Sequence, residues 1–270
     1  MLNFMFRLYL LLVFVLVISM PLDVFSSIDD IAKAYDNFLK DTGKICNSHS
    51  ECKNNTICMK ISKDEGHCTV KPSLATGILD LPFEAGHEVV CTQSWGNLKG
   101  THGWRSAYFS IDLATPYKKA SGKVRAVQSG IAKIYTQCKD PKGTPEKSEW
   151  NKCGMGLGNN VRIFHANGLM SLYAHLHKIL IKDGQKIKKG EIIGIEGATG
   201  AAGHRHLHWD IQKIPGGEKI VQEVMQSESL NGVSIPFKFR IKSNGKTKIL
   251  DSSEIHCKWD DMSQEKWIAP

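Results

Sequence analysis

Eight cysteines limit what this 270-residue chain can fold into more than any other feature. Their number is even, and four fall within 23 residues, a polar segment too small to build a core of its own. Disulfides must therefore substitute for a core there. A structural zinc site would require paired Cys-x-x-Cys spacings, which do not occur. The chain is predicted to form up to four disulfides in an oxidising compartment, through the cysteines at 46, 52, 58, 68, 91, 138, 153 and 257.

The sequence alone leaves the pairing of these cysteines open. Closeness in the chain favours pairs among residues 46, 52, 58 and 68. Cys138 and Cys153 would close a polar stretch with two prolines and a glycine, which leaves Cys91 for Cys257 by elimination. That stretch is predicted to be a loop, either the wall of a cleft or a stabilised insertion.

The first 26 residues also predict export. Arg7 precedes an almost uninterrupted apolar run from Leu8 to Met20, and small residues suited to cleavage follow near Ser26. This pattern is typical of a secretory signal peptide and too short for a comfortable membrane span, with an uncleaved anchor as the alternative. We expect a secreted, periplasmic or extracellular protein with no stable membrane insertion after signal removal.

The charge of the chain indicates what it would meet outside the cell. The net charge of +8 survives removal of residues 1–26, which contain one Arg and one Asp. A basic secreted protein favours anionic surfaces such as cell walls or acidic glycans. The lysines are scattered and form no patch interleaved with aromatic residues, so we expect no nucleic-acid partner.

Two segments precede the main body of the chain. Residues 27–43 predict one short amphipathic helix, with Ser27 as N-cap and Gly43 as the C-terminal stop. The cysteine-dense residues 44–68 resemble a separate small module. We place the domain boundaries at a signal peptide (1–26), a helix with a cysteine-rich module (27–73), a main domain (77–245) and a C-terminal extension packed on it (246–270).

From about Gly77 onward the sequence changes to short β-type runs punctuated by Gly, Asn and Pro. The clearest hairpin joins residues 161–166 to residues 169–176 through Asn167-Gly168, a pair typical of a tight type I′ turn. Residues 185–197 contain Lys189-Gly190 between two apolar stretches and predict further strand pairs. The fold class is therefore mainly β: a compact antiparallel sheet or barrel-like domain with a small disulfide-rich N-terminal module.

The stretch His206-Leu207-His208-Trp209-Asp210-Ile211 is the most informative for function. Alternation along a strand puts both histidines on one face and the apolar residues on the other. Neutral imidazole is the commonest protein ligand for zinc. An isolated His-x-His pair is more often a solvated strand face, so the metal interpretation depends on other residues.

Three further residues could converge with this pair on one ion. His102 lies in a glycine-flanked segment, and His175 lies between Ala174 and Leu176. Asp112 is flanked by Ile111 and Leu113, and a carboxylate near a core strand requires a partner.

Several motifs occur in order between Gly156 and Ile211: Tyr173-Ala174-His175-Leu176, Gly184-Gln185-Lys186-Ile187-Lys188-Lys189-Gly190, Gly197-Ala198-Thr199-Gly200 and His206-Leu207-His208. This run resembles the zinc metallopeptidases of the lysostaphin and LytM type, peptidase family M23. The resemblance covers roughly residues 77–245 and says nothing about the N-terminal module.

The resemblance implies a role for each matched residue. His102, Asp112 and His208 would be the ligands of one zinc ion per chain, and His175 and His206 the catalytic histidines. Nine residues separate His102 from Asp112, whereas many members of the family place these ligands three residues apart. The longer spacing resembles the secreted branch that includes the LasA protease. His102 is thus the least secure ligand, with His87 as the alternative.

The residue types suit metal-assisted hydrolysis. Two imidazoles and a carboxylate leave zinc an open position for a nucleophilic water. His175 or His206 would accept its proton, and the other would stabilise the oxyanion or assist the leaving amine; the sequence does not separate them. No His-Glu-x-x-His helix or Gly-x-Ser-x-Gly elbow occurs, which excludes those two protease templates. His165, His177 and His204 lie outside the matched positions and are expected at the rim or in solvent.

Two hypotheses follow. The first is a secreted zinc metalloendopeptidase that cleaves peptide bonds in peptidoglycan cross-links or Gly-rich peptides. The alternative is a non-catalytic secreted cell-wall-binding or regulatory protein on the same fold. The N-terminal module is a targeting unit, an inhibitory prosegment or a stabilising appendage, and we expect that catalysis does not need it.

Overall fold

The computed structural model describes residues 30, 33–63, 65–116, 119–135, 138, 153–227, 230–257 and 265–270. The predicted signal peptide, the predicted N-cap Ser27 and residues 139–152 of the predicted loop lie outside these residues. None of the helices in the described ranges has the length and apolar character needed to cross a membrane.

A twelve-stranded sheet forms the body of the molecule, and the mainly β class is confirmed. Its path runs β12-β8-β9-β10-β14-β6-β5-β18-β16-β17, with β15 beside β14 and β4 beside β16. Among the described strand pairs, only β4 and β16 run parallel. The strands are β4 (Ile78–Asp80), β5 (Glu88–Gln93), β6 (Ile111–Ala114), β8 (Gly130–Tyr135), β9 (Asn160–Phe164), β10 (Leu169–Ala174), β12 (Lys186–Ile187), β14 (Leu207–Lys213), β15 (Val233–Ser234), β16 (Lys238–Ser243), β17 (Lys246–Asp251) and β18 (Trp267–Ile268).

A second sheet, in the order β11-β13-β7, is formed by β7 (Lys123–Arg125), β11 (Lys178–Ile179) and β13 (Ile192–Ile195). Residues 185–197 thus contain two strands, as expected, but β12 and β13 do not pair with each other. β12 pairs with β8, whereas β13 lies between β11 and β7.

The hairpin predicted around Asn167-Gly168 is formed by β9 and β10, with Met170 opposite Phe164. The predicted type I′ turn is wrong. The Gly168 N–H donates to the His165 carbonyl at 3.1 Å, so Ala166 and Asn167 are the central residues. A type I′ turn needs positive φ at both central residues, but only Gly168, after them, has one, at 72°.

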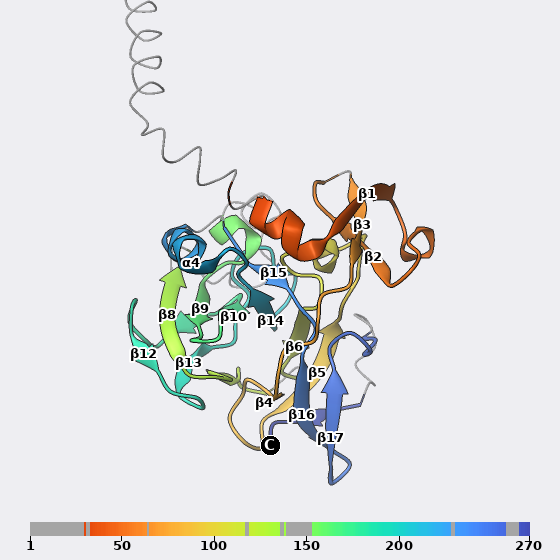
Figure 1. Cartoon of the computed structure of the whole chain (residues 1–270). Helices are drawn as coiled ribbons and strands as arrows, with labels where there is room; N and C mark the ends of the chain where they lie inside the picture. The colour runs from red at the N-terminus through yellow and green to blue at the C-terminus, as the bar shows by residue number, and fades with distance from the viewer. Residues whose placement is uncertain are drawn as a thin grey trace, which may run out of the picture.

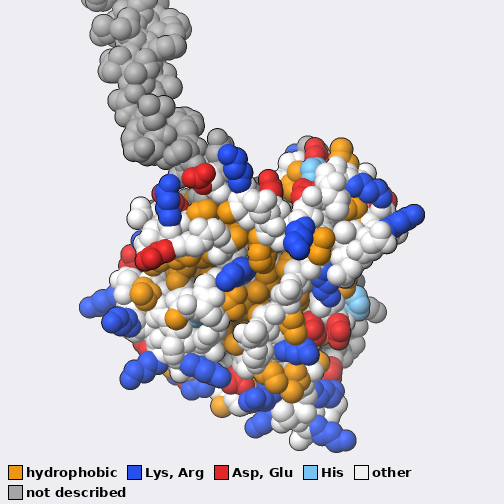
Figure 2. Space-filling view, in the orientation of Figure 1, with side chains coloured by type: hydrophobic (Ala, Val, Ile, Leu, Met, Phe, Trp, Pro, Cys, Tyr) orange, Lys and Arg blue, Asp and Glu red, His pale blue; other side chains and the backbone are white. Residues whose placement is uncertain are grey.

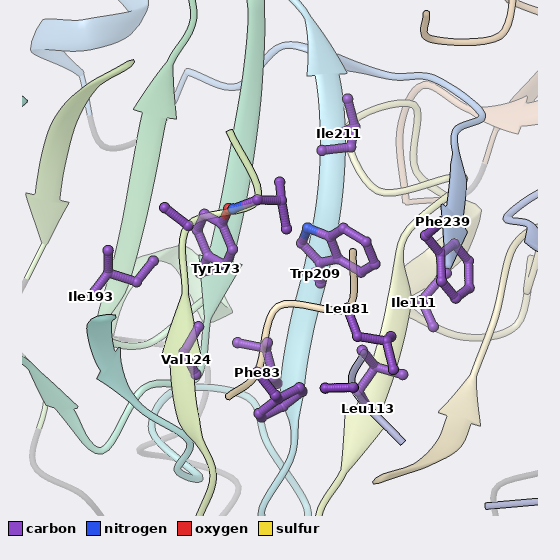
Figure 3. Close-up of a cluster of buried hydrophobic side chains, with 14 of the residues drawn as sticks. Leu81, Phe83, Ile111, Leu113, Val124, Tyr173, Ile193, Trp209, Ile211 and Phe239 are labelled. Atoms are coloured by element: carbon purple, nitrogen blue, oxygen red, sulfur yellow. The ribbon is translucent and has the colours of Figure 1, made fainter. Parts of the chain in front are cut away.

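The large core lies against β14, whose residues Trp209 and Ile211 point to one face (Figure 3), and Leu207 belongs to the same core. Trp209 packs edge-on against Phe237, with ring centroids 4.7 Å apart. Burial of each such side chain contributes roughly 1.5–3 kcal/mol. The other face of β14 is also buried and carries polar residues, so these residues need partners inside the protein.

The N-terminal segments form a lobe of their own at the upper right of Figure 1. β1 (Asp41–Cys46), β2 (Thr56–Lys60) and β3 (Gly66–Val70) form a three-stranded sheet in the order β1-β3-β2, with the 3-10 helix η1 (His49–Glu51) between β1 and β2. Residues 33–39 are helical. The helix ends there, not at Gly43 as expected, because Lys40 adopts a left-handed conformation (φ 47°) and β1 begins at the next residue.

This lobe is not isolated from the body. Tyr35, Leu39 and Met59 are buried in one apolar cluster with Tyr108 and Phe109. The same cluster takes in Ile220 and Val224 of α4 (Gly217–Gln226), a helix that the sequence analysis did not foresee.

All eight cysteines are paired. The disulfides are Cys46–Cys58, Cys52–Cys68, Cys91–Cys257 and Cys138–Cys153. The first four cysteines pair among themselves and Cys138 pairs with Cys153, as chain proximity favours, and Cys91–Cys257 is the pair expected by elimination. Cys91–Cys257 ties the C-terminal segment to β5.

Candidate metal centre

Strand β14 positions the centre because it lies between β10 and β6. His208 pairs directly with Asp112 of β6 on one side and with Ala174 of β10 on the other. His175 follows Ala174 at once. Three neighbouring strands therefore bring together residues that lie far apart in the sequence.

Three side chains converge on one point. Oδ1 of Asp112 lies 3.0 Å from Nδ1 of His208 and 3.2 Å from Nε2 of His102. The two imidazole nitrogens are 3.2 Å apart. His102 comes from the 3-10 helix η2 (Thr101–Gly103), and its side chain is fully buried. This trio is a group of described residues that could hold a metal ion.

The spacing of these atoms fits a zinc site. Tetrahedral zinc with bonds of about 2.0–2.1 Å puts neighbouring ligand atoms about 3.3 Å apart. The three observed separations lie within a few tenths of an ångström of that value.

Hydrogen bonding also prepares His102 to act as a ligand. Nδ1 of His102 lies 3.1 Å from the Ser94 carbonyl oxygen, which can only accept, so Nδ1 carries the proton in the neutral ring. Its Nε2 then presents a lone pair toward Asp112. A histidine that donates one ring N–H to a backbone carbonyl and presents the other nitrogen is the usual arrangement of a metal-ligating histidine.

The electrostatics of the trio reflect the buried carboxylate. Burial alone would raise the pKa of Asp112, but His102 and His206 hold it well below its usual range. Burial would lower the pKa of His102, yet the Asp112 carboxylate raises it overall. For His208, burial dominates and lowers the pKa, so its ring is neutral near pH 7. Nε2 of His208 is buried without a hydrogen-bond partner among the described residues.

Two more imidazoles flank the trio. The rings of His175 and His206 lie with centroids 4.6 Å apart, and His175 is 5.9 Å from His208. Nδ1 of His175 donates to the Thr199 carbonyl at 2.8 Å, and Nδ1 of His206 donates to the His204 carbonyl at 2.9 Å. Each neutral ring therefore keeps its Nε2 lone pair free to accept a proton.

His175 has two further properties of a functional residue. Its φ is 63°, a left-handed conformation that costs a non-glycine residue about 1–3 kcal/mol. Burial, and then the neighbouring His206 and His208, lower its pKa well below the usual value. The ring is therefore neutral near pH 7. Nε2 of His206 lies 3.7 Å from Oδ2 of Asp112, so this pair meets the trio directly.

The structure brings all five sequence-predicted residues into one cluster and leaves the alternative ligand outside it. His87 stacks on Phe83 and hydrogen-bonds to Thr115 Oγ1 at 2.9 Å. His165 is buried elsewhere, between the Ser129 carbonyl and Ser171. His177 is exposed.

Two polar residues near the site were missed. His204, expected at the rim, stacks on His206 with centroids 4.9 Å apart, and burial lowers its pKa to about 4. Asp210 lies on β14 beyond His208, and complete burial raises its pKa to about 7. The alternation that places His206 and His208 on one face also places Asp210 there, so the signal was present.

Part of the chain is similar to known proteins. Residues 107–222 match the model of peptidase family M23. The peptidoglycan DD-endopeptidase ShyA of Vibrio cholerae is 38% identical over 35% of this chain and 21% of its own length. The DD-carboxypeptidase/endopeptidase Mpg of Neisseria meningitidis is 36% identical over 40% of this chain and 20% of its own length. The match to this chain thus spans about a fifth of the length of these curated relatives.

Among solved structures, the catalytic domain of lysostaphin from Staphylococcus simulans is similar with 22% identity and a TM-score of 0.32. The match covers 52% of this chain and 92% of that one.

Proposed function

Residues 107–222 form a domain of peptidase family M23, and from this premise we propose that the chain is a zinc metalloendopeptidase that cleaves peptide bonds in peptidoglycan cross-links or Gly-rich peptides. One observation carries the proposal. Three buried ligand atoms lie 3.0–3.2 Å apart, and the imidazoles of His175 and His206 stand beside them.

In this proposal Asp112 Oδ1, His102 Nε2 and His208 Nδ1 hold one zinc ion. Zinc in such a site supplies Lewis acidity, which makes a water molecule nucleophilic near pH 7. A site with three protein ligands leaves a fourth position open for chemistry. The buried surroundings strengthen every charge interaction with the reacting groups.

The flanking imidazoles move the protons. A neutral ring is a general base at pH 7, and its Nε2 can take the proton of the attacking water and later give it to the leaving amine. The depressed pKa of His175 keeps that ring neutral. The carbonyls of Thr199 and His204 fix the tautomers of His175 and His206, so neither ring has to reorganise before proton transfer.

The substrate class rests on relatives and on charge. ShyA is named a peptidoglycan DD-endopeptidase and Mpg a DD-carboxypeptidase/endopeptidase. The net charge of +8 suits an anionic wall. Figure 2 shows Lys and Arg spread around the rim of one face, with apolar side chains nearer its centre. Secretion to the periplasm or the exterior belongs to the same proposal and is supported by the apolar leader and the four disulfides.

The test is mass analysis of fragments released from purified peptidoglycan, with and without a chelator. We expect new amino termini at cross-link peptides, loss of release with chelator, and recovery on adding zinc. The variant His208→Ala should be inactive. Full and chelator-insensitive release by His208→Ala would refute the proposal. A stoichiometric zinc without turnover on any bacterial peptidoglycan would instead favour the non-catalytic wall-binding alternative.

A further inference from the structure

His102 is carried by a loop that has little regular secondary structure. We call residues 94–105 the His102 loop. Its regular structure is limited to the three residues of η2, and His102 has non-helical backbone angles even there (φ −82°, ψ 17°). Asp112 and His208, in contrast, lie on paired strands of the main sheet. The position of His102 therefore depends on what the loop packs against.

Much of that support comes from the cysteine-rich module, residues 41–70. His49 of η1 reaches across to the loop, where its Nε2 lies 3.1 Å from the Gly96 carbonyl oxygen. The carbonyl can only accept, so Nε2 donates. The Tyr108 hydroxyl lies 3.1 Å from Nδ1 and 3.2 Å from Nε2 of His49, and because Nε2 carries the proton the hydroxyl donates to Nδ1. The Gly96 N–H in turn donates to the Tyr108 carbonyl at 3.0 Å.

The module also meets the loop at two other places. Leu98, in the middle of the loop, packs against the buried disulfide cluster of the module. At the end of the loop, Trp104 forms a β-bridge with Lys60, and the Arg105 N–H donates to the Lys60 carbonyl at 3.3 Å. A side chain added at Gly103 would approach the Leu98 Cα to 2.8 Å, so the loop folds back tightly on itself.

The C-terminal segment holds the beginning of the loop. The Cys257 N–H donates to Ser94 Oγ at 3.1 Å, while the Ser94 carbonyl accepts from His102. Trp95 lies between two imidazoles, with centroids 6.0 Å from His49 and 5.8 Å from His256. The loop is thus held from both sides.

We propose that the cysteine-rich module positions the first metal ligand and that His49 is the positioning residue through which it acts. The inference rests on the proposed function in that His102 is taken to bind zinc. His49 touches neither the metal ligands nor the reacting groups; it fixes the backbone at Gly96, two residues after the Ser94 carbonyl that orients the His102 ring. This replaces the expectation that catalysis does not need the module.

Three variants of the full-length protein separate positioning from general stability. His49→Phe keeps an aromatic ring and removes both hydrogen bonds. His49→Gln keeps an amide that can donate to Gly96 and an oxygen that can accept from Tyr108. The matched control is His67→Phe, because His67 is a part-buried histidine of the same module whose ring bonds to Asp41 and Glu65 of that module.

Two measurements apply to each variant. Hydrogen–deuterium exchange of the metal-free protein reports directly on the backbone of residues 94–105. Zinc affinity, measured by competition with a chromophoric chelator, reports on the positioning of the His102 side chain as a metal ligand. We expect His49→Phe to speed exchange in the His102 loop and to weaken zinc binding by about 10- to 100-fold, the range for loss of an outer-sphere support. His49→Gln should recover both, and His67→Phe should change neither.

The outcomes are distinguishable from those that test the proposed function. Unchanged exchange in the His102 loop of His49→Phe would overturn the inference, whatever the protein binds. Equal effects of His49→Phe and His67→Phe would also overturn it, in favour of a purely stabilising module. If the wild-type protein binds no zinc, the proposed function fails, while the exchange data still decide whether His49 fixes the loop.

Discussion

Nδ1 of His208 lies 3.0 Å from Oδ1 of Asp112 because the two residues are direct partners across β14 and β6. A register shifted by one residue would put the two side chains on opposite faces of the sheet. The candidate metal centre is therefore built into the pairing of the main sheet, and of its three residues only His102 lies on a loop.

Removing one of the sheet-borne ligands should abolish tight metal binding. His208→Ala leaves two donors of three, so we expect zinc affinity to fall by more than the roughly 100-fold that loss of an outer-sphere partner causes. Metal content of the purified protein, with a chelator-competition titration, measures this. His177→Ala is the control, since His177 is an exposed histidine outside the cluster, and it should retain a full equivalent of zinc.

The flanking imidazoles should affect turnover without affecting the metal. We expect His175→Gln and His206→Gln each to retain zinc and to lower kcat by about 10²- to 10⁴-fold, the usual contribution of a general acid or base. Steady-state kinetics on a cross-link peptide, read beside the zinc content, test this. A variant with unchanged kcat would exclude its histidine from proton transfer.

A glycine beside the Thr199 carbonyl should be indispensable. Gly158 has φ +64°, and an added Cβ would lie 2.4 Å from the carbonyl carbon and oxygen of Thr199, the group that orients His175. We expect Gly158→Ala to destabilise the protein by more than the about 1–3 kcal/mol of backbone strain and to lower kcat.

Gly184→Ala is the control for that strain. Gly184 has φ +73° with no atom within 4 Å of its added Cβ, so it tests positive φ alone. Denaturant unfolding and kinetics on both variants separate strain from displacement of the carbonyl. Equal loss of stability in the two, with kcat preserved in both, would contradict the prediction.

The metal-free protein should lose stability in acid partly through His175. Burial holds the folded-state pKa of His175 well below the unfolded value of about 6.5, so below that pH the unfolded chain binds a proton that the folded one does not. Its contribution to the free energy of unfolding is present above pH 6.5 and is lost as the pH falls.

Denaturant unfolding of metal-free protein between pH 7.5 and 5, the range of about one unit or more on each side of that value, measures this loss. The variant His175→Gln cannot take up the proton, so its stability should decline less over this range than that of the wild type. Parallel curves for the two proteins would show that His175 does not carry this linkage.

Much of the candidate site could be predicted because its signals are local. The two histidines of His206-Leu207-His208 lie on the face of the strand opposite Trp209, as alternation requires. Asp112 was suspect as a carboxylate within an apolar run, and it is buried beside two imidazoles. Chain proximity and elimination indicated Cys138–Cys153, Cys91–Cys257 and pairing within the first four cysteines, but not the pairs Cys46–Cys58 and Cys52–Cys68 themselves.

Other features depend on contacts that the local sequence pattern does not indicate. The carbonyls of Ser94 and Thr199 orient two imidazoles through the backbone, and a backbone carbonyl is common to every residue type, so the sequence does not indicate this role. Lys40 ends the first helix without the glycine that usually does so. Helix α4 has ten residues, of which only Ile220 and Val224 are buried, and two buried apolar positions are too few to predict a helix from the sequence.

The position of β14 late in the chain has a consequence for the order of events during synthesis. His102, Asp112 and His175 are all made before the strand that unites them, and pairing β14 with β6 joins residues 96 positions apart. The chain loses the entropy of closing a large loop before such a distant pairing gains its contacts. A nascent chain that ends before His208 therefore cannot bring these side chains together, however long its preceding part has been available to fold.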